Sequence, residues 1–192
     1  QSRTGLKEFE NGTCSSTASS WAIHGELGNG LVASFNPHCH GGGGSGQWDA
    51  HGDMQGHAPL CRQTDKPIAG LIRDLKQRGM LDSTIVHWGG EIGRLPVTQE
   101  HGSADTAGRD HNGQGFSIWL AGGGIRGGMT FGATDEFGHK AVENVVTPND
   151  FQATLFHLFG LDHRQLSYLL NGREQQITAG REARLLSEII KS

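Results

Sequence analysis

Apolar positions in the middle of the chain predict a helix that is followed closely by a strand. They repeat at spacings of three and four residues, as on one face of a helix: Ile68, Leu71, Ile72 and Leu75. Thr64 has the residue type of an N-cap, Pro67 lies in the expected first turn, and Gly79 is a typical helix end. The β-branched and aromatic run 84–88 then predicts a short strand.

The second half of the chain repeats this alternation of strand and helix. Residues 116–120 form another β-rich run, and Thr147, Pro148 and Asp150 have the residue types of a helix start. The apolar stripe of that helix consists of Phe151, Leu155, Leu158 and Phe159. A last helix is expected over residues 181–190. Because helices alternate with strands, the sequence predicts an α/β domain with a mainly parallel sheet flanked by helices.

The first part of the chain has a different composition from the rest. Residues 1–37 are rich in Gly, Ser, Thr and Asn, show weak periodicity, and include the polar run 13–20. We therefore expect residues 1–37 to be an irregular or unrelated leader and residues 38–192 to form the folded domain.

Composition excludes some classes of function. The chain has 192 residues and a net charge of -4 from 16 basic and 20 acidic residues, without a basic block, which argues against nucleic-acid binding through phosphates. Its apolar runs are too short to predict a membrane span. The three cysteines, Cys14, Cys39 and Cys61, form no CxxC pair, and both a single disulfide and a reduced state remain open.

Three glycine-bounded loops carry side chains that suit metal or anion chemistry. Asp49 and His51 lie two residues apart and could approach one divalent ion. Glu91 follows the strand 84–88, and Arg94 could hold an anionic oxygen. Asp110 and His111 offer a ligand and a partner beside it. Each loop alone also fits an ordinary surface turn or ion pair.

The order of these motifs resembles the C-terminal half of bacterial proteins that contain domain of unknown function 1501. The resemblance covers about residues 38–192 and rests on segments 48–51, 65–79, 81–94, 108–112, 119–124, 155–163 and 171–174. It implies a partial alkaline phosphatase/sulfatase-like fold. The N-terminal half of that family, which would supply the nucleophile, has no match in this chain, so no catalytic nucleophile is assigned.

The resemblance also implies a divalent metal, with zinc, calcium and magnesium as candidates. Its implied ligands are Asp49, His51, Glu91 and His111. Asp110 would be an alternative ligand or would contact one of the ligands rather than the metal. Arg94 would bind the anionic part of a substrate. The histidine that should follow the acid at position 91 is missing from this sequence.

The resemblance thus implies a metal-dependent hydrolase of small phosphate or sulfate esters, in a chain that is incomplete and inactive alone. One alternative is a non-catalytic binding or surface protein on the same fold, which the missing histidine favours. Another is a metal-binding domain with no ester substrate. The family resemblance further implies a location in the bacterial periplasm or at the cell exterior. The oligomeric state is not predicted.

Overall fold

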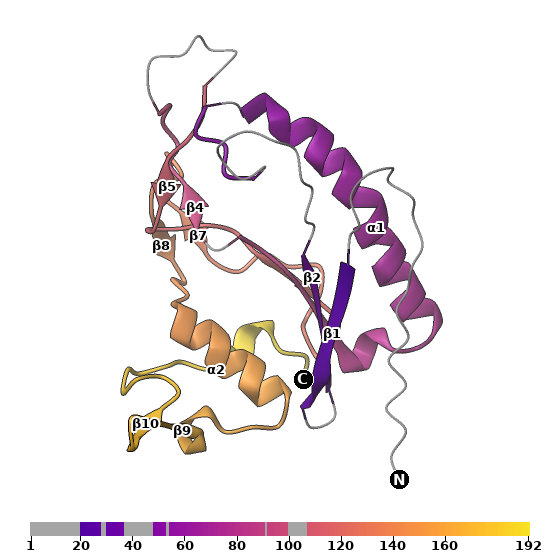
Figure 1. The fold of residues 1–192 in the computed structure, drawn as a ribbon, viewed down its shortest axis with the longest axis vertical. Coiled ribbons are helices and arrows are strands. Elements are labelled where there is room, and N and C mark those ends of the chain that lie inside the picture. The colour runs from indigo at the N-terminus through magenta and orange to yellow at the C-terminus, as the bar shows by residue number, and fades with distance from the viewer. Residues whose placement is uncertain (1–19, 28–29, 37–47, 53, 91, 100–106) are drawn as a thin grey trace.

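A computed structural model of the chain describes residues 20–27, 30–36, 48–52, 54–90, 92–99 and 107–192. The long helix α1 (His57–Gln77) lies along one side of a central sheet, and the shorter helix α2 (Pro148–Leu158) lies beyond the other side (Figure 1). Within the described part of the chain, no helix is long and apolar enough to cross a membrane.

The central sheet has four strands in the order β1-β2-β3-β6. Strands β1 (Ser20–Leu27) and β2 (Gly30–Asn36) form an antiparallel hairpin. Strand β3 (Thr84–Trp88), at the predicted position, runs parallel to β2, and β6 (Trp119–Ala121) pairs antiparallel with β3. Residues in β1 and β2 are therefore extended strands where irregular backbone was expected. The division of the chain at residue 37 stays a prediction.

The predicted α/β fold with a mainly parallel sheet, and with it the partial alkaline phosphatase/sulfatase-like fold, is wrong. Among the described strands, β2 and β3 are the one parallel pair, and every other pairing is antiparallel. No sheet in this part of the chain is therefore built of parallel strands. Parallel pairing needs a crossover connection, and α1 supplies one between β2 and β3. The described part of the connection from β3 to β6 contains no helix, and β6 pairs antiparallel with β3.

The remaining strands of the described residues form three small antiparallel sheets. They are β4 (Gly93–Arg94) with β5 (His111–Asn112), β7 (Ala133–Thr134) with β8 (Ala141–Glu143), and β9 (Ser167–Leu170) with β10 (Arg173–Gln176). The first pair lies in two of the glycine-bounded segments that the sequence predicted to be loops. Its pairing places Arg94 opposite His111.

Helix α1 begins seven residues before the predicted N-cap, at His57 rather than at Thr64. The Thr64 hydroxyl is not a cap: it is buried and donates to the backbone oxygens of Leu60 at 3.1 Å and Cys61 at 3.2 Å, within the helix. Pro67 accordingly lies inside the helix. The predicted end holds, because Gly79 follows with a left-handed φ of 68°. Cys61 is a free, exposed thiol, while Cys14 and Cys39 lie outside the described residues.

Helix α2 confirms the predicted helix start. Thr147 and Asp150 form a reciprocal capping box: the Thr147 backbone N–H donates to Asp150 Oδ2 at 2.9 Å, and the Asp150 N–H donates to Thr147 Oγ1 at 3.2 Å. The second oxygen of Asp150 accepts from the backbone N–H of Arg184 at 2.6 Å. One carboxylate thus starts the helix and anchors the C-terminal segment.

The predicted helix over residues 181–190 is wrong, because this segment bonds to other parts of the chain. Besides the Arg184 N–H, the Leu186 N–H donates to the Thr154 hydroxyl on α2 at 3.1 Å. Those donors are therefore not used in helical bonds to carbonyls four residues earlier. Only a single 3-10 turn forms, at Ser187–Ile189, and Leu186 is 1% exposed.

Asp150→Asn is expected to lower the free energy of unfolding by about 1–3 kcal/mol, because it weakens two buried charge-assisted hydrogen bonds. Burial alone would raise the pKa of Asp150, but the N–H groups of Arg184 and Thr147 outweigh it and the net shift is downward. Its stabilising contribution is therefore present above the ordinary value of 3.8 and is lost as the pH falls below it.

Urea denaturation at neutral and acid pH checks this expectation, and the control is Asp82→Asn. Asp82 is 88% exposed and makes a surface ion pair with Lys191, so its loss should change stability by about 0–1 kcal/mol. Equal stability of the two variants at neutral pH would show that Asp150 does not anchor the C-terminal segment.

Candidate metal centre

Two segments that are distant in sequence form the site, and backbone contacts hold them together. Residues 48–52 make a turn before α1, in which the His51 N–H donates to the Asp49 oxygen at 3.1 Å. The Arg109 N–H donates to the Ala50 oxygen at 3.0 Å, and the Met54 N–H donates to the Ala107 oxygen at 3.0 Å. The turn is therefore fixed against residues 107–109.

Glycine at position 108 permits this close approach. A Cβ placed there would overlap the carbonyl group of His51 and the backbone nitrogen of Gly52. The absence of a side chain lets the two backbones touch, which brings the turn that carries Asp49 and His51 next to the strand that carries His111.

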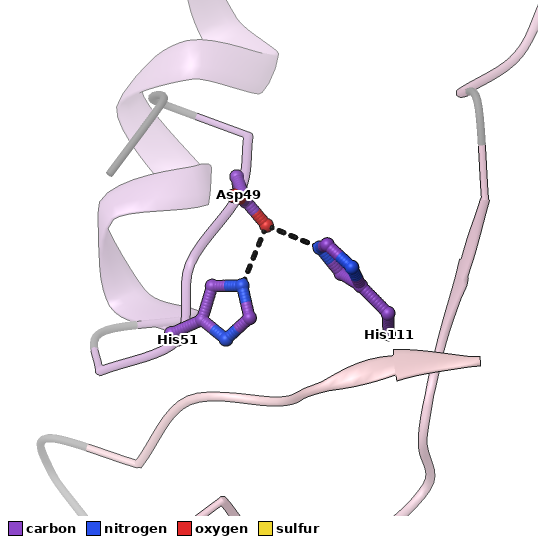
Figure 2. A group of neighbouring side chains, drawn as sticks. All are labelled: Asp49, His51 and His111. Atoms are coloured by element: carbon purple, nitrogen blue, oxygen red, sulfur yellow. Dashed lines mark hydrogen bonds and ion pairs between the residues drawn. The ribbon is translucent and has the colours of Figure 1, made fainter.

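Asp49, His51 and His111 converge on one point. Oδ1 of Asp49 lies 2.9 Å from Nε2 of His51 and 2.9 Å from Nε2 of His111, and the two imidazole rings are 4.9 Å apart. Figure 2 shows both rings directed at the carboxylate, His51 from the turn before α1 and His111 from β5. One ligand atom from each residue lies within 4.8 Å of the others, so the group could hold a metal ion.

Arg94 contacts the same carboxylate oxygen. Its Nη1 lies 2.5 Å from Asp49 Oδ1 and also donates to the Arg109 backbone oxygen at 3.5 Å. The hydrogen bond from His111, opposed by burial and helped by Arg94, lowers the pKa of Asp49 to about 2. The carboxylate is therefore ionised at neutral pH, which is the form that binds a cation.

Asp110 lies beside the convergence point and does not reach it in the present arrangement. Its Oδ1 accepts from the His111 backbone N–H at 2.7 Å and is 3.8 Å from His51 Nδ1. Glu91, the fourth predicted ligand, lies outside the described residues. The structure thus brings together three of the four predicted ligands and places Arg94 and Asp110 around them.

Gln99, which no sequence pattern indicated, has a side chain that reaches the site. Its Oε1 lies 2.6 Å from Nδ1 of His51. Gln99 belongs to no recognisable motif and is distant in sequence from both histidines. Its position follows from the backbone bridge between Gln99 and Gly108, whose backbone lies against that of His51.

The donor set suits zinc. Two imidazole nitrogens and one carboxylate oxygen are ligands typical of zinc sites, and three protein ligands leave a position for water or substrate. The side chains of His51, Asp49 and His111 are 32%, 38% and 44% exposed, so solvent reaches the group.

The family described as "Protein of unknown function (DUF1501)" matches residues 38–190. The chain belongs to this family. Searches of curated proteins and of solved structures each found no match. Asp49, His51 and His111 all lie within the DUF1501 match, as do Arg94 and Gln99, so the whole described site belongs to the family region.

Proposed function

We propose that Asp49, His51 and His111 bind one divalent metal ion and that this centre serves the hydrolysis of phosphate or sulfate esters. The observation that carries the metal site is the convergence of three ligand atoms. An amide oxygen accepts hydrogen bonds only, so the 2.6 Å contact with Gln99 makes His51 Nδ1 a donor. In the neutral ring, Nε2 then carries a lone pair. It lies 2.9 Å from the anionic oxygen of Asp49, so a cation that replaced this direct contact would be bound by both atoms.

Zinc is the metal that we propose among the three candidates. Calcium and magnesium prefer carboxylate, carbonyl and water oxygens, whereas two of the three ligands here are imidazole nitrogens. Calcium also takes six to eight ligands, which this set does not provide.

The proposed chemistry assigns a task to each residue of the chain. A bound divalent metal would supply Lewis acidity and lower the pKa of bound water. Asp49 and the two imidazoles would hold it, with the carboxylate offsetting part of its charge. The guanidinium of Arg94 has five N–H donors, so those not used by Asp49 and the Arg109 carbonyl can bind the oxygens of a phosphate or sulfate group.

The proposed role of Arg94 predicts anion binding by the chain itself. The zinc-loaded chain should bind inorganic phosphate, and Arg94→Met should weaken that binding about 10–150-fold, because a charge-assisted hydrogen bond contributes about 1.5–3 kcal/mol. Isothermal titration with phosphate measures this. Arg126→Met removes an exposed arginine outside the site and should leave the affinity unchanged.

Turnover measurements on zinc-loaded protein distinguish ester hydrolysis from anion binding alone. Aryl phosphate and aryl sulfate turnover would be measured for this chain and for a longer protein that includes the N-terminal half of the family. A zinc-loaded chain that binds neither phosphate nor sulfate, with no turnover in the longer protein, would contradict ester hydrolysis.

A metal-binding domain without ester chemistry is the second candidate. The contact between Arg94 and Asp49 favours it, because one guanidinium donor is already directed at a ligand rather than at a substrate. Under that alternative, zinc binds and Arg94→Met has no effect on phosphate affinity.

A further inference from the structure

We propose that Gln99 is a positioning residue that keeps the His51 proton on Nδ1 and thereby presents Nε2 as the metal ligand. This inference rests on the proposed metal site and adds a residue that supports it. Metal-binding histidines commonly donate their second ring nitrogen to an oxygen acceptor, which fixes the tautomer and the ring orientation.

The two nitrogens of His51 have different partners. Nδ1 is 2.6 Å from Oε1 of Gln99, and Nε2 is 2.9 Å from Oδ1 of Asp49. Because the amide oxygen of Gln99 can only accept, Nδ1 carries a proton, and in the neutral ring the Nε2 lone pair then points at the site. The opposite tautomer would place a lone pair against the Gln99 oxygen.

Asp110 is the other candidate partner for Nδ1, and the distances exclude it. Its Oδ1 is 3.8 Å from Nδ1, beyond hydrogen-bond length, and already accepts from the His111 backbone N–H at 2.7 Å. Asp110, which the sequence suggested as a supporting residue, therefore does not accept the hydrogen bond from His51 Nδ1. Gln99 accepts that hydrogen bond.

The backbone places Gln99 independently of its side chain. Its N–H donates to the Gly108 oxygen at 3.0 Å in an antiparallel bridge, and Gly108 packs against the backbone of His51. Substitutions that change only the end of the Gln99 side chain keep this bridge. They therefore test the acceptor rather than the fold of the loop.

The test compares Gln99→Met, which removes the acceptor at similar length, with Gln99→Glu, which keeps an oxygen there. Zinc affinity is measured by competition with a chelator. We expect Gln99→Met to bind zinc about 10–100-fold more weakly and Gln99→Glu to stay within about threefold of the natural chain. Gln152→Met, on the exposed face of α2, is the matched control and should have no effect.

The second readout is the His51 tautomer, from nitrogen-15 NMR of the metal-free protein at alkaline pH, where imidazole is neutral. The natural chain and Gln99→Glu should carry the proton on Nδ1, and Gln99→Met should lose this preference. A proton on Nε2 in the natural chain would overturn the proposal, even where a variant fails to fold.

The outcomes also separate this inference from the metal site itself. A natural chain that binds no zinc contradicts the metal site, and the tautomer measurement still decides the role of Gln99. Zinc binding that is equal in the natural chain and in folded Gln99→Met contradicts the positioning role and leaves the metal site standing.

Discussion

His111→Ala is expected to lower zinc affinity about hundredfold or more. Nε2 of His111 is one of three ligand atoms within 4.8 Å of one another, and the two remaining residues cannot enclose an ion. Structural zinc sites with four ligands contribute about 10–16 kcal/mol, which is roughly 3 kcal/mol per ligand. That amount corresponds to a factor of about one hundred in affinity.

Metal content after dialysis against trace zinc measures this loss. The control is His157→Ala, which removes an exposed histidine from α2 and should retain the zinc of the natural chain. His111→Ala also removes a hydrogen bond to Asp49, so its fold is checked by circular dichroism. Equal zinc content in the two variants would show that His111 is not a ligand.

Gly108→Ala is expected to destabilise the fold and to abolish zinc binding together. The added methyl group would overlap backbone atoms of His51 and Gly52, which cannot rotate away as a side chain can. The turn at residues 48–52 must then separate from β5, which moves Asp49 and His51 away from His111. Overpacking of this kind costs about 1–3 kcal/mol or more.

Gly113→Ala provides the matched comparison, because a Cβ at Gly113 would meet no heavy atom within 4 Å. Thermal unfolding and zinc titration of both variants measure the two effects. We expect Gly113→Ala to unfold within a few degrees of the natural chain and to bind zinc normally. Normal zinc binding by Gly108→Ala would show that the contact between the two backbones does not shape the site.

Local signals in the sequence predicted those elements that depend on neighbouring residues. The strand at 84–88 and the start of α2 depend on a β-branched run and on a reciprocal cap between Thr147 and Asp150, and both lie as expected. The three residues Asp49, His51 and His111 were also named from local motifs, and the structure brings them together.

Interactions between distant segments account for the wrong predictions. The C-terminal segment bonds to the side chains of Asp150 and Thr154, which no pattern within residues 181–190 reveals. Strand β6 pairs antiparallel with β3, and the described part of the connection between them contains no helix. The hairpin of β1 and β2 supplies two further strands to the sheet. The alternation of helices and strands along the sequence therefore led to the wrong prediction of a mainly parallel sheet.

The site shows the same division between local and distant effects. Composition and spacing indicated carboxylate and imidazole ligands but could not indicate Gln99, whose place depends on the bridge to Gly108. Nor could they show that Arg94 contacts Asp49, which follows from the register of β4 against β5.

X-ray absorption spectroscopy at the zinc edge, on the zinc-loaded natural chain, tests the central claim most directly. The account predicts about one zinc per chain, bound by nitrogen and oxygen only, with the scattering pattern of two imidazoles. A folded chain that binds no zinc would contradict it. So would zinc with sulfur ligands, because the metal would then be held by cysteines rather than by Asp49, His51 and His111.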